Sequence, residues 1–348
     1  MQTIMAVMHD GIDEVQIRRA GDILKEGGLV AFPTETVYGL GGNALDAQAS
    51  AKIYAAKGRP SDNPLIVHIA DWDAIYKIVS EVPPEAKKLA DAFWPGPLTM
   101  ILKKSDAVPL ATTGGLNTVA IRMPSNEVAR ALIRAGGGYV AAPSANTSGR
   151  PSPTCAAHVA QDLSGKIEMI IDGGSVDIGL ESTIVDLTEG KPTILRPGYI
   201  NQEMLGQVLD EVEMDRGLIS PDSNVHPKAP GMKYRHYAPK ADLIIVEGEA
   251  ARVREKINEL VRENLAAGKK AGVIGTDESL LYYKEGDVRS IGSRKEEITI
   301  ARHLYSILRD FDESDISVIY SESFETPKIG QAIMNRLIKA AGHQIIKV

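Results

Sequence analysis

The chain has 348 residues, enough for two hydrophobic cores, because single cores stop growing at roughly 250–300 residues. Its formal net charge of −7 argues against a broad basic surface for nucleic acid, and its one cysteine, Cys155, excludes an intramolecular disulfide and a zinc site of cysteine ligands. No stretch approaches the roughly 20 apolar residues of a membrane span, and the acidic N-terminal region is unlike a secretory signal, so we expect a cytoplasmic protein.

Short apolar stretches alternate with amphipathic stretches through the first part of the chain. This pattern predicts an α/β domain over residues 1–212, with a large mixed sheet and helices between its strands. The expected helices cover 13–26, 47–57, 84–93 and 126–136, and the expected strands cover 29–32, 65–69, 98–102, 119–123, 139–142, 169–171, 183–185 and 193–195.

Residues 213–240 differ in composition from the segments around them. Four prolines fix the backbone and interrupt hydrogen-bond ladders, which is typical of a linker. The second half of this linker contains Tyr234, Arg235 and His236, and a solvated spacer needs no such aromatic residues. We therefore expect this half to dock on another part of the protein.

A second alternation of strands and helices begins near residue 241. It predicts a smaller, Rossmann-like α/β domain over 241–348, in which helices cover a parallel sheet. No glycine-rich phosphate loop follows its first strand, so we expect no nucleotide site there. The expected strands cover 243–246, 272–275 and 316–320, and the expected helices cover 249–267, 296–311 and 327–341.

Cations and hydroxyl groups gather at strand ends of the first domain, where open α/β sheets hold their ligands. Lys57 and Arg59 flank a glycine directly after a helix. They could be simple partners of the helix dipole, but the stiff polar loop that follows suits phosphate oxygens. The segment 141–152 combines hydroxyls, an amide and an arginine between two prolines, which favours a phosphate and ribose loop over a plain surface loop.

Other polar residues are ambiguous on their own. Arg122 interrupts an apolar strand, and a buried arginine either pairs with a structural carboxylate or receives an anionic ligand. His68 lies on an apolar strand, where a lone histidine is more often a core residue than a catalyst. Ser182 and Arg196 could both be structural. The sequence lacks a Walker loop, a Rossmann glycine fingerprint, a Ser-His-Asp set and metal-ligand spacings, so a nucleotide would be bound by a different design.

Taken together, these segments resemble a known family. Lys57-Gly-Arg59 and Ser144-Ala-Asn146, with Pro-Thr-Glu-Thr-Val-Tyr-Gly-Leu at 33–40, resemble the YrdC-like family, and the linker and second domain resemble its long, two-domain threonylcarbamoyl-AMP synthases. The resemblance covers nearly the whole chain. It implies an N-terminal YrdC-like twisted sheet and an enzyme that joins L-threonine, bicarbonate or CO₂ and ATP, with Mg²⁺, into threonylcarbamoyl-AMP, the first step of N6-threonylcarbamoyladenosine formation in tRNA.

The resemblance also implies roles for particular residues. Lys57, Arg59, Ser144 and Asn146 would be catalytic, and the linker would close over the site as a lid. The Mg²⁺ ion would be held mainly by the phosphates of ATP, so no protein metal ligand is expected. A separate threonylcarbamoyl-transfer complex would take up the product, with direct tRNA contact a weaker expectation. The threonine set would be Thr36, His68, Arg122, Ala142 and Ser182; the nucleotide set would be Arg59, Asn63, Thr118, Ser144, Ser152, Arg196, Tyr234, Arg235 and His236.

Three alternatives remain open at this point. A concave basic surface could bind an RNA backbone, although the clusters hold isolated cations rather than a basic patch with stacking aromatic residues. The carbamoyl-transfer enzymes of hydrogenase maturation share the YrdC-like domain, but they carry cysteine-rich zinc fingers that one cysteine cannot supply. The second domain could also be a scaffold that recruits partners.

Overall fold

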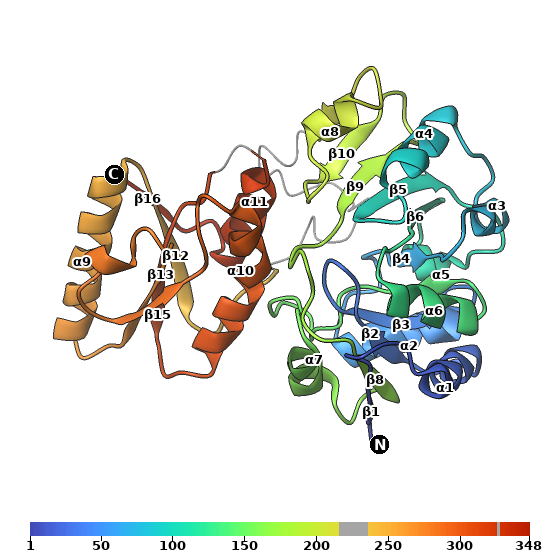
Figure 1. The fold of residues 1–348 in the computed structure, drawn as a ribbon, viewed down its shortest axis with the longest axis horizontal. Coiled ribbons are helices and arrows are strands. Elements are labelled where there is room, and N and C mark those ends of the chain that lie inside the picture. Colours follow the sequence, from blue (N-terminus) through green and yellow to red (C-terminus); the bar gives the residue numbers. More distant parts are fainter. Residues whose placement is uncertain (216–235, 326–327) are drawn as a thin grey trace. The chain divides into compact units, whose positions relative to one another are not determined.

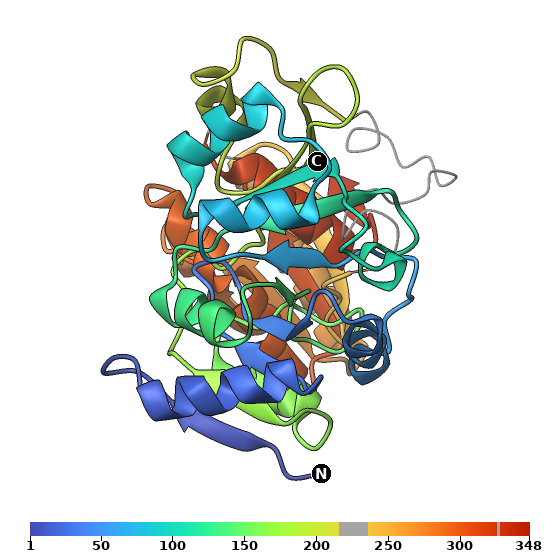
Figure 2. The same cartoon turned by 90° about the vertical axis from the view of Figure 1, so that its right-hand side faces the viewer.

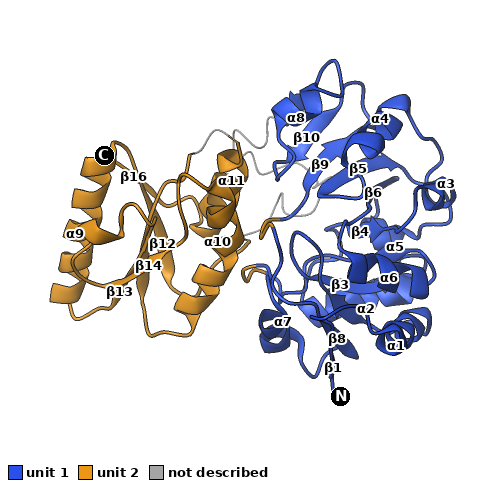
Figure 3. Ribbon diagram, viewed as in Figure 1, with its two compact units in different colours: residues 1–148, 152–177, 181–234 blue, residues 149–151, 178–180, 235–348 orange. Residues whose placement is uncertain are grey.

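The computed structural model describes residues 1–215, 236–325 and 328–348 (Figure 1). The chain forms two compact units (Figure 3), and two short segments that come well before residue 235 in the sequence belong to the second unit. The domain boundaries expected at residues 212 and 240 stay a prediction. Unit 1 comprises Met1–Ser148, Ser152–Asp177 and Glu181–Tyr234, and unit 2 comprises Gly149–Pro151, Ile178–Leu180 and Arg235–Val348.

Unit 1 is built on one mixed sheet of eleven strands. The strands are β1 (Ile4–Val7), β2 (Val30–Phe32), β3 (Gly39–Asn43), β4 (Ile66–His68), β5 (Leu98–Lys103), β6 (Thr118–Arg122), β7 (Val140–Ala141), β8 (Met169–Asp172), β9 (Thr183–Asp186), β10 (Thr193–Arg196) and β11 (Glu213–Met214). Their order across the sheet is β1-β8-β2-β3-β7-β4-β6-β5-β9-β10-β11.

The helices of unit 1 begin and end at residues suited to those positions. The Asp13 carboxylate accepts hydrogen bonds from two amides in the first turn of α1, and Gly58, in the left-handed conformation at φ 61°, ends α2. Helices α1 and α6 lie side by side (Figure 2), and a Cβ on Gly21 would lie 2.6 Å from the Ala135 backbone. The helices are α1 (Glu14–Lys25), α2 (Ala47–Lys57), α3 (Ile75–Ile78), α4 (Pro84–Phe93), α5 (Leu110–Thr113), α6 (Glu127–Ala135), α7 (Ala156–Leu163) and α8 (Gln202–Gly206).

The two faces of this sheet have different neighbours. One face packs against α2, α4 and α7 in the main core, to which β6 contributes Ile121. The other face packs against α1 and α6, but only over one half of the sheet, where Phe32 and Val140 belong to one apolar cluster with residues of both helices. Over β4, β6, β5, β9 and β10, this second face carries a separate cluster, and every member of that cluster is a strand residue. Its members are Ile66, Ile101, Ala120, Ile184 and Leu195.

Unit 2 has a five-stranded sheet in which every described pair is parallel, in the order β14-β13-β15-β12-β16. Its long helix α9 begins at the carboxylate of Glu249, which accepts from two amides of the first turn. Among the described helices of the chain, none is long and apolar enough to cross a membrane. The elements are β12 (Asp242–Glu247), α9 (Ala250–Ala266), β13 (Ala271–Gly275), β14 (Asp287–Ser290), α10 (Glu297–Asp312), β15 (Val318–Glu322), α11 (Gly330–Ala340) and β16 (Ile345–Lys347).

The predicted fold class is confirmed: a mixed sheet with helices is followed by a smaller parallel α/β sheet. The predicted helices and strands all occur, and their ends differ from the predicted ones by at most three residues. The most informative omission is β3, a strand with a glycine-rich sequence. A Cβ on Gly41 would lie 2.9 Å from both Phe32 and Val140, so this strand needs glycine in order to pack between its neighbours. The other omissions are β1, β11, β14, β16, α3, α5, α7 and α8.

Candidate active site

Polar side chains form a row across the middle strands of unit 1. His68, the last residue of β4, lies opposite Arg122, the last residue of β6, and Arg122 lies opposite Thr99 of β5. Residues directly opposite each other on paired strands point to the same face of the sheet. These three side chains therefore project from the face that carries the strand-only apolar cluster.

Hydrogen bonds extend this row in both directions. The Thr99 and Ser182 hydroxyls are 2.7 Å apart, and Arg196 donates from Nε to the Ser182 carbonyl at 3.0 Å and from Nη2 to the Ser182 hydroxyl at 3.1 Å. On the other side, the Ala142 amide donates to the Ile66 carbonyl of β4 at 2.9 Å. The residues that we call the polar row are His68, Arg122, Thr99, Ser182 and Arg196.

Arg122 has a carboxylate partner. Glu35, in the loop between β2 and β3, lies with Oε1 2.7 Å from Arg122 Nη2, and both residues are almost completely buried. The Thr34 hydroxyl fixes this loop, since it donates to the Val37 carbonyl at 2.6 Å and lies 2.9 Å from the Thr36 hydroxyl. Thr36, predicted to bind threonine, is therefore next to the carboxylate that faces Arg122.

His68 is held in its neutral form. Burial, together with the nearby positive charge of Arg122, lowers the pKa of His68 from 6.5 to about 3. Its Nδ1 lies 3.1 Å from the Ile66 carbonyl, and its ring makes an edge contact with Phe32. At neutral pH, His68 therefore adds shape and hydrogen-bonding capacity to the row but no charge.

Lys57 connects α2 to the segment that carries Ser144 and Asn146. Its buried ammonium group donates to the Ser144 carbonyl at 2.5 Å and also to the Asn146 carbonyl. The Ser144 hydroxyl in turn donates to Asn146 Oδ1 at 2.5 Å. Three of the four predicted catalytic residues thus form one connected group, and Ala142, of the threonine set, lies two residues before Ser144.

The fourth predicted catalytic residue, Arg59, lies beside Asn63 and donates from Nε to the Asn63 carbonyl at 3.4 Å. Asn63 is buried, and its side-chain oxygen accepts no hydrogen bond from any described residue. Thr118 begins β6 and points to the same face as Arg122, which lies four residues further on, a distance of about 13 Å at 3.3 Å per residue. Thr118 therefore lies toward the opposite end of β6 from Arg122, whereas Arg196, of the same nucleotide set, contacts Ser182 of the threonine set.

Ser152 completes the part of the nucleotide set that lies in unit 1. Its hydroxyl donates to Glu181 Oε1 at 2.6 Å, directly beside Ser182 of the polar row. His236 belongs to unit 2, and its ring lies 5.5 Å from that of Tyr237. Tyr234 and Arg235 lie outside the described residues, as does most of the segment predicted to form a lid.

An apolar strip separates Thr118 from Arg122 on this face of the sheet. Ala120 lies between Thr118 and Arg122 on β6, and it belongs to the strand-only cluster with Ile66 and Ile101 on the flanking strands. All members of that cluster are buried. Their apolar side chains offer no partner for a phosphate or a carboxylate, so the charged parts of a ligand would be bound by the polar residues on either side of the strip.

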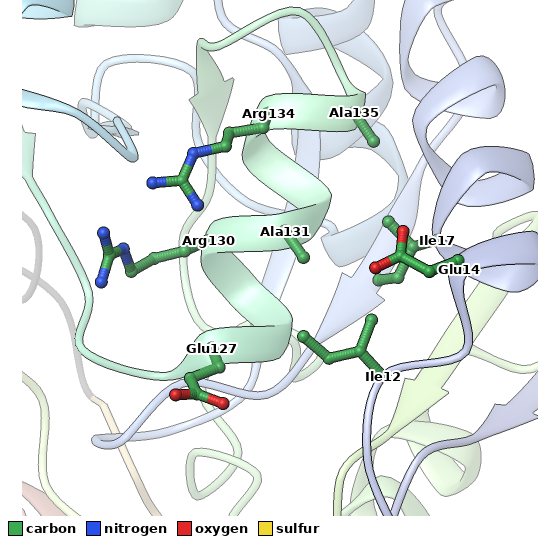
Figure 4. Close-up of a pocket in the computed structure, with 8 residues that line it drawn as sticks. All are labelled: Ile12, Glu14, Ile17, Glu127, Arg130, Ala131, Arg134 and Ala135. Carbon is green, nitrogen blue, oxygen red and sulfur yellow. The ribbon is translucent and has the colours of Figure 1, made fainter.

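Two other hollows within the units lie away from the polar row. One, of about 520 Å³, opens between α1 and α6, and the guanidinium groups of Arg130 and Arg134 point away from Ile12 and Ile17 on its opposite wall (Figure 4). The other, of about 400 Å³, has Glu322 of β15 in its wall. Neither contains a residue of the predicted sets, and no three His, Cys, Asp or Glu side chains among the described residues could together hold a metal ion.

Sequence reasoning missed three residues that support this arrangement. Glu35 lies in a segment that was already singled out, but its pairing with Arg122 spans a long stretch of sequence. Glu181 precedes Ser182 and was likewise not assigned a role. Thr99 is a single polar residue within an apolar strand, and this interruption is the same signal that drew attention to Arg122.

Two family models together match most of the chain. The first, described as "Telomere recombination" and named for Sua5, YciO and YrdC, matches residues 22–198. The second, described as "Threonylcarbamoyl-AMP synthase, C-terminal domain", matches residues 200–342.

Similar proteins and structures extend over both units. The threonylcarbamoyl-AMP synthase of Pyrococcus abyssi is 51% identical and covers 99% of this chain and 100% of its own length, and that of Bacillus subtilis is 49% identical over 96% and 95%. The crystal structure of P. abyssi Sua5 complexed with L-threonine has a TM-score of 0.94 at 49% identity and covers 99% of this chain and 100% of its own. The chain therefore belongs to the family of two-domain threonylcarbamoyl-AMP synthases, as its motifs predicted.

Proposed function

We propose that this chain condenses L-threonine, bicarbonate or CO₂, and ATP into threonylcarbamoyl-AMP, with release of pyrophosphate. Curated relatives that match nearly the whole chain at 49–51% identity carry the name of this activity, and a P. abyssi relative has been crystallised with L-threonine. The observation that carries the proposal is the polar row, which joins the threonine set to the nucleotide set on one face of one sheet.

The threonine end of the row has the groups that an amino acid needs. The Arg122 guanidinium would bind the carboxylate, since planar guanidinium groups pair well with carboxylate oxygens. The hydroxyls of Thr36 and Ser182 and the neutral ring of His68 would surround the rest of the substrate. The side chain of Ala142 is only a methyl group, so it leaves room for the substrate beside these residues.

The nucleotide end has the groups that phosphates and a nucleoside need. Arg59, Lys57 and Arg196 supply positive charge, and the loop from Ser144 to Ser152 supplies hydroxyl and amide donors. The Asn63 side-chain oxygen is a buried acceptor that a ligand N–H group could satisfy. Mg²⁺ would enter on the phosphate oxygens of ATP, where it neutralises charge on the departing pyrophosphate.

The reaction needs no protein nucleophile. The deprotonated threonine amine attacks CO₂ to give a carbamate and a proton, or attacks bicarbonate to give a carbamate and water. One carbamate oxygen then attacks the α-phosphorus of ATP, the bond to the bridging oxygen breaks, and pyrophosphate leaves. The protein's contribution is to place the two reactants side by side and to compensate the negative charge that builds up around phosphorus. The hydrogen bonds from Arg196 to Ser182 support that role, because they bring a cation of the nucleotide set next to a residue of the threonine set.

The product is a mixed anhydride and is labile in water, so a second enzyme must consume it quickly. We place that consumer as a threonylcarbamoyl-transfer complex acting on tRNA adenosine, in the cytoplasm. The RNA-binding alternative is less favoured because His68, Arg122, Ser182 and Arg196 are buried, and an RNA backbone binds to exposed cations.

The test is to follow a labelled carbon into the product. The full chain is incubated with ATP, Mg²⁺, L-threonine and ¹³C-bicarbonate, and the products are analysed by mass spectrometry. We expect threonylcarbamoyl-AMP that is one mass unit heavier than the product from unlabelled bicarbonate. Pyrophosphate should appear only when threonine is present.

Two controls make the result specific. L-Valine has nearly the shape of threonine but a methyl group in place of the hydroxyl, and it should give far less product. Pyrophosphate release that is indifferent to threonine, or an unlabelled adenylate, would reject the proposal. Salt-dependent tRNA binding without any adenylate would favour the RNA-binding alternative instead.

A further inference from the structure

Glu35 and Arg122 form a buried ion pair whose hydrogen bonding is incomplete. The atoms Glu35 Oε1 and Arg122 Nη2 are 2.7 Å apart, yet neither oxygen of Glu35 accepts a well-aligned hydrogen bond from any described residue. The Arg122 Nε and Nη2 groups likewise donate no aligned hydrogen bond. The N–H groups of Arg122 are therefore not directed at the carboxylate, although the charges are close.

An exposed pair in the same unit shows what complete bonding looks like. Arg134 donates to both oxygens of Asp71, from Nε at 3.0 Å and from Nη2 at 2.6 Å. A buried pair has more need of such bonds, because neither ion has water around it. The Glu35–Arg122 pair is the one that lacks them, and it lies among the residues predicted to surround an amino acid.

An α-amino acid carries both missing partners on one carbon atom. Its carboxylate can accept from a guanidinium group, and its ammonium group can donate to a carboxylate. The receptor for such a zwitterion must therefore hold one positive and one negative group next to each other. Glu35 and Arg122 meet this requirement, since their charged groups lie 2.7 Å apart.

We infer that Glu35 is the receptor for the ammonium group of the amino-acid substrate, while Arg122 receives its carboxylate. This inference rests on the proposed function and adds a residue that the motifs did not assign. With Glu35 in this role, the positive charge on the substrate nitrogen determines which carboxylic acids the site prefers. Carboxylic acids that lack the amine fill the same space and satisfy Arg122, but they leave the Glu35 carboxylate without a donor.

The experiment combines a change in the protein with a change in the ligand, as in a double-mutant cycle. Affinities for L-threonine and for (R)-3-hydroxybutanoate, which is threonine without its amine, are measured by ligand-observed NMR for the wild-type chain and for Glu35→Gln. We expect wild type to prefer threonine by about 100-fold, the usual order for a charged hydrogen-bonding group in a buried site. Glu35→Gln should lose at least about 10-fold of that preference and bind 3-hydroxybutanoate as wild type does.

Each outcome separates Glu35 from the proposed function. If Glu35→Gln weakens both ligands equally, Glu35 only holds Arg122 in place and the inference is overturned, although threonine binding and the proposed function stand. If wild type does not bind threonine at all, the proposed function itself fails. Asp71→Asn is the matched control, since it removes a carboxylate from the exposed pair with Arg134, and it should leave both affinities unchanged.

A measurement on wild type alone covers the case in which Glu35→Gln does not fold. Equal binding of threonine and 3-hydroxybutanoate by wild type would show that no ammonium receptor exists. In addition, Glu35→Asp keeps the charge but shortens the side chain by one methylene group. We expect this variant to retain part of the preference for threonine, and complete loss of the preference with normal 3-hydroxybutanoate binding would still support the inference.

Discussion

Arg122 in unit 1 and Arg309 in unit 2 are both nearly inaccessible, with 4% and 2% of their surface exposed, but they are bonded differently. Arg309 donates from Nε at 3.1 Å and from Nη2 at 2.6 Å to the Pro151 carbonyl. Arg122 faces a carboxylate without such directed bonds. A buried arginine that points its N–H groups at backbone fixes the chain, whereas one with a counter-ion and undirected N–H groups can exchange that partner for a ligand.

Arg309 also shows that unit 2 holds a short segment from the earlier part of the chain. Its partner Pro151 comes directly before Ser152 of the nucleotide set. The two residues before Pro151 are held within unit 2 as well: the Ala238 amide donates to the Gly149 carbonyl at 2.9 Å, and Arg150 lies 3.6 Å from Asp312. Unit 2 therefore fixes the backbone of a segment that leads into the predicted ATP site, which a purely recruiting scaffold would have no reason to do.

The largest effect should come from Arg122, which is predicted to bind the substrate carboxylate. In Arg122→Met, the substrate carboxylate loses its partner and Glu35 stays buried without a counter-ion. We expect threonine affinity to fall on the order of 10³-fold, and the free energy of unfolding to fall by about 3–5 kcal/mol. Calorimetric titration with threonine and urea unfolding measure the two effects.

The exposed arginine of the same unit is the control for this prediction. Arg134→Met should change threonine affinity by no more than about twofold, because its ion pair with Asp71 is at the surface. Combining Arg122→Met with Glu35→Gln should restore part of the lost stability but none of the affinity. Recovery of threonine binding in the double variant would show that Arg122 is structural, and the contrast with Arg309 would then disappear.

A variant of Lys57 tests whether one buried cation can both hold the backbone of the segment 144–146 and take part in catalysis. Lys57→Met shortens the side chain by only one atom but removes the charge and both hydrogen bonds to the segment 144–146. We expect turnover to fall on the order of 10²-fold, with threonine affinity changed little. Lys52 of the same helix donates to the Gly27 carbonyl at 2.5 Å and gives the matched control, Lys52→Met, which should keep normal turnover.

The sequence predicts the elements of this site better than it predicts their connections. Arg122 is recognisable because a cation interrupts an apolar strand, but its partner lies in a distant loop, and only the sheet order brings the two together. The pairing of Thr99 with Ser182 depends on strand register, which a single sequence does not specify. The helix that carries Arg309 was predicted, yet nothing in its pattern distinguishes this arginine from the exposed charges around it.

Arg309→Met should affect the nucleotide rather than threonine. The Pro151 carbonyl would lose two hydrogen bonds from a charged donor, and we expect the free energy of unfolding to fall by about 3 kcal/mol. Because Pro151 precedes Ser152, the KM for ATP should rise by about 10-fold while threonine affinity stays constant. Steady-state kinetics with each substrate varied in turn measures the split.

The control must destabilise unit 2 equally without touching the segment 149–151. Ile257→Ala removes a fully buried side chain from α9, in a separate part of the unit 2 core, and should cost about 2–5 kcal/mol. We expect this variant to keep the KM for ATP of wild type at temperatures where both remain folded. If both variants raise the KM alike, general loss of stability accounts for the effect and Arg309 has no positioning role.

The smallest expected effect is the change in stability with pH that is caused by the buried His68. Because its pKa is about 3 in the folded chain and 6.5 when unfolded, the unfolded state binds the extra proton between these values. His68 therefore lowers stability as pH falls below 6.5, by up to about 1.4 kcal/mol per pH unit, and contributes nothing above pH 7. Urea unfolding of wild type and His68→Gln should show a difference that is constant above pH 7 and shifts in favour of His68→Gln toward pH 4.5. In Arg122→Met, the stability contribution of His68 should depend less steeply on pH, but the dependence should not disappear. Burial is the larger cause of the low pKa of His68, and the charge of Arg122 is the smaller one. If the pH dependence vanished in Arg122→Met, the charge of the arginine would be the dominant cause.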